Sequence, residues 1–362
     1  MNKKVLLIIS SIFLAFLVIL LSCLGIMRVN AEPAAPEATA TPAPTPTPKP
    51  TPTPEPEYYT ISFIGDLTLA SSQYNNDFEN KMKDDYSYPF KNTVEYFEND
   101  DLTVGNLECT FSDKYMSSYT TFNFLAPAAF ANILVEGGVD FVTTANNHSD
   151  DFSDQGIADT DASLDAVDMP HAGENGTYIY DMGDIKVGIY CAFNGFQPSI
   201  SKTETAIADL REAGAQYIIC AFHWGNEGTY RPTQDQKNLA HAAIDAGANV
   251  VYGSHPHVLQ PVEEYGDGLI MYSMGNFSFG GNTAPRDRDS AIVQVTVKRE
   301  FDGTITTDGY SLIPCCLSST DNINDYCPKP YDEGTEEYDR AMSKLDGSFA
   351  GNDLSVDYSQ YH

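Results

Sequence analysis

Three of the chain's seven histidines follow short apolar runs within one stretch of the sequence. His223 follows Tyr217–Phe222, and His255 and His257 follow Ala248–Tyr252. Short apolar runs bounded by turn residues are typical of buried strands in a parallel sheet. Ligands of α/β proteins gather at the carboxyl ends of such strands. Imidazoles at these positions could bind a metal ion or transfer protons.

The segment His255-Pro256-His257 predicts two imidazoles on one side of a stiff backbone. The residue before a proline favours extended conformations, and the proline fixes its own φ angle. In an extended segment, residues i and i+2 point to the same side. The alternative is a pair of solvated loop histidines. We favour a metal site because three histidines lie just past the ends of predicted strands.

Residues able to bind a metal or move a proton also end most of the other predicted strands. The full set is Asp66, Glu108, Asn147 with His148, His223, and His255 with His257. Structural carboxylates are normally scattered over solvated faces, so repetition at strand after strand indicates a single site. Carboxylate, amide and imidazole groups without a thiolate form a ligand set suited to Mn, Fe, Zn or Mg.

The elements that must position these residues alternate between strands and helices, which indicates an α/β fold. Hairpins at Gly183-Asp184 and Asp302-Gly303 indicate that the sheets are mixed rather than purely parallel. We expect strands at 58–64, 102–105, 139–145, 186–192, 217–222, 248–252, 269–273, 290–301 and 304–311, and helices at 127–137, 154–167, 204–213 and 232–246.

The amino-terminal residues 1–31 are predicted to be a membrane anchor or a signal peptide. Lys3 and Lys4 precede an apolar run, 5–27, that is long enough to span a bilayer. Cleavage after Ala31 and lipid attachment at Cys23 are the alternatives to the anchor. We therefore expect the rest of the chain to lie outside the cytoplasm, anchored in the cell membrane, secreted or lipid-anchored. Residues 32–57 form a Pro/Thr-rich linker, which favours an extended spacer.

Residues 58–317 are long enough for one large domain. Residues 318–362 are acidic and tyrosine-rich, and are predicted to form a poorly ordered or loosely docked tail. The chain has 20 Lys+Arg against 51 Asp+Glu, a formal charge of −31. This charge argues against nucleic acid and anionic lipid as partners. A polyanionic substrate would need a local cation, such as a bound metal.

The cysteines outside the targeting segment have no C-x-x-C spacing, which argues against a zinc knuckle. Cys191 and Cys220 end apolar runs and are expected to be buried thiols. The sequence does not decide whether a disulfide forms within Cys315–Cys327.

Six short motifs follow one another along the chain: F-I-G-D-L at Phe63–Leu67, G-N-L-E at Gly105–Glu108, A-N-N-H-S-D-D at Ala145–Asp151, H-W-G-N-E at His223–Glu227, H-P-H-V-L-Q-P at His255–Pro261 and S-M-G-N-F at Ser273–Phe277. With these motifs in this order, the chain resembles the bacterial capsule-synthesis and poly-γ-glutamate-synthesis CapA proteins, a family related to calcineurin-like metallophosphoesterases. The resemblance extends from about Thr60 to Phe279, and the ordered set is highly specific.

The resemblance implies a four-layer α/β/β/α sandwich with mixed sheets and a centre for one or two divalent metal ions. By motif, Asp66 and His257 would bind a first metal, Glu108 would bridge, and Asn147, His223 and His255 would bind a second. His148 would donate a proton to the leaving group. The phosphoesterases carry Asp-x-His where this chain has Asp66-Leu67-Thr68, and Asp where it has Glu108. A single tightly held ion is therefore also open.

We expect a function in the synthesis or export of an anionic surface polymer, with metal-dependent hydrolase or transferase chemistry. The partners would be the polymer or its precursor and other synthesis or export proteins. His148 would act as general acid, and Asp151 would either orient it or begin a helix. The first alternative is a non-catalytic component of the export complex with a structural or degenerate metal site. The second is a substrate-binding domain on a stalk, without metal.

A few further residues near the motifs have interpretations of their own. Glu227 and Trp224 could form pocket walls, although Trp224 could equally belong to the core. Asn276 is expected to hold a loop through side-chain-to-backbone hydrogen bonds. Arg286 and Arg288 either meet an anionic substrate or lie on the exposed surface.

Overall fold

The computed structural model describes residues 55–72, 77–114, 116–118, 120–194 and 199–356. The predicted targeting segment 1–31 and almost all of the predicted linker lie outside these residues. Within the described part of the chain, no helix is long and apolar enough to cross a membrane.

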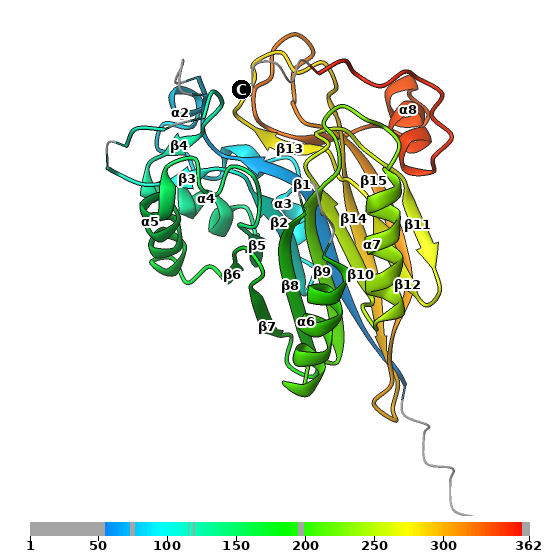
Figure 1. The fold of residues 1–362 in the computed structure, drawn as a ribbon. Coiled ribbons are helices and arrows are strands. Elements are labelled where there is room, and N and C mark those ends of the chain that lie inside the picture. The colour runs from blue at the N-terminus through cyan, green and yellow to red at the C-terminus, as the bar shows by residue number, and fades with distance from the viewer. Residues whose placement is uncertain (1–54, 73–76, 115, 119, 195–198, 357–362) are drawn as a thin grey trace, which may run out of the picture. The chain divides into compact units, whose positions relative to one another are not determined.

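Two mixed sheets form the centre of the fold (Figure 1). The eight-stranded sheet has the order β16 (Lys329–Pro330), β15 (Ile305–Cys316), β14 (Asp289–Arg299), β1 (Glu57–Thr68), β2 (Leu102–Leu107), β5 (Phe141–Thr143) and β6 (His171–Ala172), with β13 (Asn276–Phe279) paired to β1. The six-stranded sheet has the order β11 (Val262–Tyr265), β12 (Gly268–Met271), β10 (Val250–Ser254), β9 (Tyr217–Trp224), β8 (Lys186–Asn194) and β7 (Thr177–Asp181). In the first sheet β1 runs parallel to β2 and antiparallel to β14, which confirms the predicted mixture.

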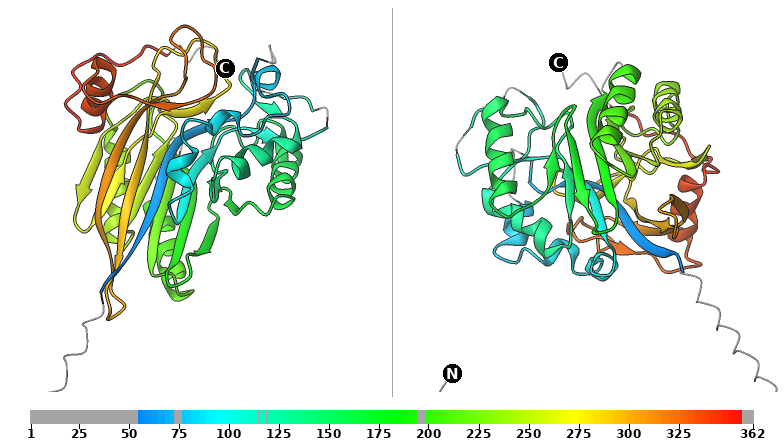
Figure 2. Two further views of the ribbon diagram at one scale, coloured as in Figure 1. Left: turned by 180° about the vertical axis from the view of Figure 1, so that it is seen from behind. Right: turned by 90° about the horizontal axis from the view of Figure 1, so that it is seen from below.

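Helices cover the outer faces of both sheets, as the views from behind and below also show (Figure 2). The six-stranded sheet carries α6 (Ile200–Glu212) and α7 (Gln234–Asp245). The eight-stranded sheet carries α2 (Asp77–Met82), α3 (Val94–Phe97), α4 (Ala131–Glu136) and α5 (Ser153–Asp165), with the small pair β3 (Thr110–Phe111) and β4 (Leu125–Ala126) beside them. The result is the predicted four-layer α/β/β/α sandwich.

Alternation along the strands builds these layers, because successive side chains of a strand point to opposite faces. On β9, Tyr217, Ile219 and Ala221 pack into the core between the sheets. Their neighbours Ile218 and Cys220 pack against α6 and α7 instead. A strand that is apolar on both faces therefore appears in the sequence as a continuous apolar run.

Local sequence signals set the ends of several elements. Thr233 begins α7 through a capping box with Gln236, in which each side chain bonds the other residue's backbone N–H. Gly247 follows the helix with a φ of 106°, a conformation that glycine adopts at little cost. The predicted helix at 232–246 is therefore close to the observed one.

The carboxy-terminal residues are integrated into the fold up to Val356, contrary to the expected poorly ordered or loosely docked tail. Helix α8 (Glu336–Leu345) begins at Thr335, which caps it, and it places Ala341 and Leu345 in the central core. Its acidic residues Glu336, Glu337 and Asp339 lie in the first turn, where negative charge interacts favourably with the helix dipole. The helix is strongly amphipathic, but it is short and flanked by polar residues, so the sequence pattern did not predict it.

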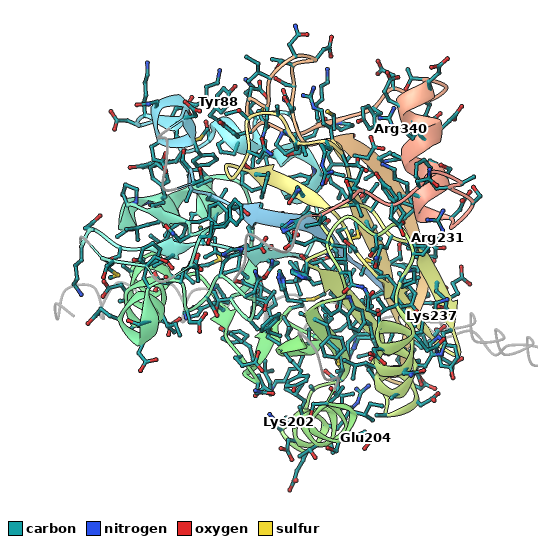
Figure 3. All side chains as sticks on the ribbon, turned by 45° about the horizontal axis from the view of Figure 1, so that its top comes forward. Tyr88, Lys202, Glu204, Arg231, Lys237 and Arg340 are labelled. Carbon is teal, nitrogen blue, oxygen red and sulfur yellow. The ribbon has the colours of Figure 1, made fainter. Side chains whose placement is uncertain are left out.

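Residues 348–356 follow α8 and form a segment that we call the carboxy-terminal strap. Arg231 holds it, donating from Nη1 to Asp353 Oδ1 at 2.9 Å and from Nη2 to the carbonyl of Gly351 at 2.8 Å. Leu354 N donates to the carbonyl of Gly228 at 2.9 Å. In Figure 3, Arg231 and Arg340 of α8 are labelled at the right of the view, and Lys202 and Glu204 of α6 at the bottom.

The six cysteines in the described part of the chain are free and buried. Cys191 and Cys220 are buried thiols as expected, and Cys315, Cys316 and Cys327 form no disulfide.

Candidate metal centre and adjoining pocket

The predicted strand-end residues converge where the carboxyl ends of both sheets meet. His223 Nε2 lies 2.6 Å from Asn147 Oδ1 and 3.4 Å from Glu108 Oε1. His257 Nδ1 lies 3.4 Å from Asp66 Oδ2, and its Nε2 lies 3.8 Å from Glu108 Oε1. Residues from β1, from the loops after β2 and β5, from β9 and from the loop after β10 thus form one cluster.

His255 belongs to the same cluster. Its ring centroid lies 4.6 Å from that of His223 and 6.0 Å from that of His257. Ligand atoms of Glu108, His255 and His257 all lie within 4.8 Å of one another, a grouping that could hold a metal ion.

The backbone of the His255-Pro256-His257 segment is not extended, so that prediction is wrong. His255 has a φ of 95° and His257 a φ of 55°. Residues other than glycine adopt these conformations at a cost, and such strain is concentrated at functional sites. The backbone N–H of His255 approaches Asp66 Oδ2 at 3.4 Å, and the carbonyl of Pro256 accepts a bond from Gly228 N at 2.8 Å. A tight turn, rather than a straight segment, brings the two imidazoles together.

The cluster has the chemistry of a cation site. Both carboxylate oxygens of Glu108 and the Nδ1 atom of His255 are buried without a hydrogen-bond partner. Buried polar atoms without partners are costly, and a coordinated cation removes that cost. Asp66 and Glu108 are fully buried, and His223 is 1 % exposed. The residues present therefore fit a divalent cation with oxygen and nitrogen ligands.

The proton affinities of the cluster are strongly perturbed. Burial raises the pKa of Glu108, with Asp66 adding to the effect. Burial lowers the pKa of His257, but Glu108 and Asp66 outweigh it and raise that pKa. Burial also lowers the pKa of His223, and it lowers that of His255 to about 3. Two imidazoles are therefore held neutral, as metal ligation requires. A cation would displace protons from Glu108 and His257.

A second layer of side chains orients the imidazoles. Asn276 Oδ1 lies 2.9 Å from His257 Nδ1, and Ser254 Oγ lies 3.0 Å from His223 Nδ1. When these Nδ1 atoms donate, each Nε2 is left to face the cluster. Asn276 Nδ2 also approaches the carbonyl of His257 at 3.4 Å, so the predicted loop-holding bond exists beside an unexpected one to the ring.

Asn106 is a positioning residue that the sequence interpretation missed. Its Nδ2 donates to Asp66 Oδ1 at 2.9 Å, and its Oδ1 accepts from Asn146 Nδ2 at 3.2 Å. It is fully buried. It stands opposite Asp66 in the register of β1 and β2. The signal was present, because Asn106 lies in the same short motif as Glu108.

His148 and Asp151 form a hydrogen-bonded pair beside the cluster. His148 Nδ1 lies 2.9 Å from Asp151 Oδ2. Asp151 is fully buried and also accepts from Thr120 Oγ1 at 3.0 Å and from Phe124 N at 3.2 Å. Helix α5 starts at Ser153 without a side-chain cap, so Asp151 orients His148 rather than beginning the helix. Burial lowers the pKa of His148, but Asp151 and Glu108 outweigh this effect and raise it.

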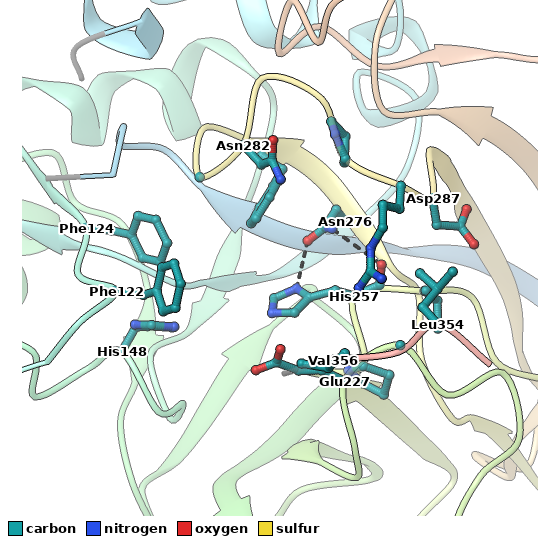
Figure 4. Close-up of a pocket in the computed structure, with 17 residues that line it drawn as sticks. Phe122, Phe124, His148, Glu227, His257, Asn276, Asn282, Asp287, Leu354 and Val356 are labelled. Carbon is teal, nitrogen blue, oxygen red and sulfur yellow. Dashed lines mark hydrogen bonds between the residues drawn. The ribbon is translucent and has the colours of Figure 1, made fainter. Parts of the chain in front are cut away.

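A pocket of about 220 Å³ adjoins the cluster (Figure 4). His148, Phe122 and Phe124 lie on one side of it, and Asp287 and Leu354 lie on the other. Its other lining residues include Glu227, Pro256, His257, Asn276, Phe279, Asn282, Arg286 and Val356. Glu227 is thus a pocket wall, as one of the sequence interpretations had it.

Two other residues with open interpretations, Trp224 and Arg288, do not line the pocket. Trp224 is 1 % exposed, packs in the core beneath α6 and α7, and donates to the carbonyl of Tyr272 at 2.9 Å. It is therefore a core residue. Arg288 donates to the carbonyls of Asp321 and Thr320 and does not line the pocket, whereas Arg286 does.

Known proteins match this chain over the stretch that contains the six motifs. The model of the family described as bacterial capsule synthesis protein PGA_cap matches residues 60–281. The chain is 28 % identical to the capsule biosynthesis protein CapA of Bacillus anthracis, over 76 % of this chain and 70 % of that protein. It is also 28 % identical to the PGA biosynthesis protein CapA of Bacillus subtilis, over 67 % of this chain and 68 % of that protein.

Similarity to solved structures is more distant. A hypothetical protein of Thermus thermophilus is 14 % identical with a TM-score of 0.46, covering 70 % of this chain and 98 % of that one. An NAD nucleotidase of Haemophilus influenzae is 12 % identical with a TM-score of 0.44, covering 84 % of this chain and 57 % of that one.

Proposed function

The chain belongs to the bacterial capsule synthesis protein family PGA_cap, and from that premise we propose that it is a metal-dependent hydrolase or transferase. It acts in the synthesis or export of an anionic surface polymer of the capsule or poly-γ-glutamate type. The observation that supports an enzymatic role most strongly is the hydrogen-bonded pair of His148 and Asp151 beside the candidate metal cluster, with His148 lining the pocket.

The side chains that would hold the metal are the six strand-end residues of the cluster. A divalent cation bound there would act as a Lewis acid toward the bond that is cleaved. The proposed ligands are Asp66, Glu108, Asn147, His223, His255 and His257.

His148 supplies the proton. Its Nδ1 faces Asp151, so its Nε2 is the atom that can serve a leaving group in the pocket. Burial lowers the pKa of His148, but the hydrogen bond to Asp151 and the charge of Glu108 raise it above its ordinary value, which favours the protonated form that a general acid needs. Asp151 fixes the ring, and Phe124, whose ring centroid lies 4.8 Å away, packs against it.

The proposed location is outside the cytoplasm, with residues 1–31 as the membrane anchor and residues 32–57 as the spacer. This placement rests on the apolar run after Lys3 and Lys4 and on the Pro/Thr-rich composition that follows. The proposed partners are the polymer or its precursor and the other proteins of its synthesis or export.

The enzymatic role is tested by His148→Ala. We expect turnover of phosphoester or glutamyl-amide substrates with Mn²⁺ to fall by roughly 10²- to 10⁴-fold, because the proton donor is lost. Metal content should stay unchanged, since His148 is not a proposed ligand. His241→Ala is the matched control, because His241 lies on α7 and contacts Glu263 and Tyr265 instead.

Stoichiometric metal with no turnover of any substrate by the wild-type chain would instead favour a non-catalytic role in polymer assembly. The substitution of Thr68 for the phosphoesterase histidine is the feature that supports this second role. A wild-type chain that binds no metal would exclude both.

A further inference from the structure

Arg286 is the only lysine or arginine among the described residues that line the pocket. It is exposed, and it stands out in a chain whose formal charge is −31. The net negative charge of the chain disfavours a polyanion, so Arg286 is a favourable point of attachment in the pocket beside the proposed metal.

The loop and the strap around Arg286 hold its guanidinium in place. Its Nη1 donates to the carbonyl of Ser355 in the carboxy-terminal strap at 2.6 Å. The next residue, Asp287, is buried and accepts from Lys344 Nζ and from Tyr230 Oη, both at 2.6 Å. Lys344 thus takes up the charge of Asp287. One bond anchors the guanidinium, and its remaining N–H groups suit a carboxylate, which accepts such a fork.

The side of the pocket on which Arg286 lies has a chemical consequence. His148, the proposed proton donor to the leaving group, lies with Phe122 and Phe124 on one side (Figure 4). Asp287, adjacent to Arg286, and Leu354, adjacent to the Ser355 that binds it, lie on the other. A substrate that spans the pocket therefore places its leaving group against aromatic rings and its retained part against a cation.

We propose that Arg286 and the carboxy-terminal strap form a subsite for a carboxylate on the part of the substrate that is retained, opposite the leaving group. This proposal rests on the metal-dependent activity proposed above, and it adds the side on which the substrate must carry its charge. Arg286 determines specificity through this carboxylate, while Leu354 and Val356 of the strap form an apolar wall beside it.

Two matched probes test the side of the charge. N-acetyl-γ-glutamyl anilide carries its carboxylate on the acyl side of the amide. The 4-acetamidobutyryl amide of 4-aminobenzoate has the same skeleton with the carboxylate moved to the amine side. Binding of each to the full chain is measured by calorimetry at fixed salt, so the result does not depend on turnover.

The acyl-side probe should bind the wild-type chain more tightly than the amine-side probe. Arg286→Gln should weaken the acyl-side probe by roughly 10- to 100-fold, as expected for a lost charge-assisted hydrogen bond, and leave the amine-side probe unchanged. Arg286→Lys should keep part of the affinity. Arg299→Gln is the charge-matched control, because Arg299 pairs with Glu57 at the other end of β14.

Equal affinity for the two probes, binding of neither, or full affinity in Arg286→Gln would each overturn the subsite. Failure of the proposed enzymatic function has a different signature, namely absence of turnover in a chain whose probe binding still depends on Arg286.

Discussion

At the scale of single residues, the candidate centre depends on side chains that do not themselves face a cation. Asn276 and Ser254 each contact the Nδ1 atom of an imidazole, and Asn106 holds a carboxylate oxygen of Asp66. Such partners fix the ring orientation and the tautomer, so their loss is felt as a loss of metal affinity. Asn106 lies in the motif of Glu108 and Ser254 directly precedes that of His255, whereas Asn276 lies in the separate motif Ser273–Phe277.

Asn276→Ala should therefore lower metal affinity by roughly 10- to 100-fold, because His257 loses the acceptor for its Nδ1 proton. Competition with a chelator of known affinity measures this change. Asn282→Ala is the control, since Asn282 lines the same pocket and is exposed, and its Oδ1 accepts from Ala284 N instead of contacting an imidazole. Equal affinity in both variants would show that Asn276 only holds the loop.

At the scale of elements, helix α8 secures the loop that leads from the pocket into β14. Lys344 is 2 % exposed and binds Asp287 and Asp289 at 2.6 and 2.7 Å. Arg340 adds two bonds to Asp289, at 2.7 and 2.8 Å. The two cations and two carboxylates balance, and removal of one partner leaves a buried charge uncompensated.

Lys344→Met should lower the free energy of unfolding by about 3–5 kcal/mol, the cost of breaking a buried ion pair from one side. Urea titration measures it. Lys202→Met, at an exposed site on α6, should change the value by no more than about 0.5 kcal/mol. Comparable small losses in both variants would mean that α8 does not anchor the loop.

The ion pairs that Lys344 and Arg340 form with Asp287 and Asp289 also make the free energy of unfolding depend on pH. Burial raises the pKa of Asp289, but Arg340 and Lys344 outweigh it and hold the pKa below its ordinary value. A carboxylate with a depressed pKa in the folded state stabilises the fold above its unfolded pKa of about 3.9. That stability is lost as the pH falls through the lower folded value. On acidification, the free energy of unfolding should fall less in Lys344→Met than in the wild-type chain. Urea titration at a series of pH values measures this difference. An identical pH dependence would assign the acid sensitivity to other groups.

At the scale of the whole folded unit, apolar runs and hairpins predicted an α/β fold with mixed sheets, and the four-layer arrangement was implied by the resemblance to the family. Continuous apolar runs such as Tyr217–Phe222 are buried on both faces, and hairpins such as the one at Asp302-Gly303 made the sheets mixed. The convergence of strand-end residues followed from the rule that ligands gather at carboxyl strand ends. The proposed ligands were therefore predictable from the sequence, whereas positioning residues such as Asn106 were not predicted.

The remaining features depend on contacts that a sequence pattern does not carry. A residue before a proline prefers an extended conformation, but His255 and His257 lie in a turn. Tertiary hydrogen bonds of this turn to Asp66 and Gly228 accompany it. Helix α8 is ordered by partners on β14 that lie about 50 positions earlier in the chain. Trp224 ends β9, and its place in the core follows only from the packing of its side chain beneath the outer helices.

The central claim is that distant side chains share one cation site, and metal analysis of the purified full chain tests it most directly. After growth or dialysis with Mn²⁺ and Zn²⁺ followed by removal of free metal, we predict at least one divalent ion per chain. The double variant Glu108→Gln, His257→Ala should retain none, while Glu263→Gln, which removes a carboxylate outside the cluster, should retain all of it. A metal-free wild-type chain, or full occupancy in the double variant, would contradict the account.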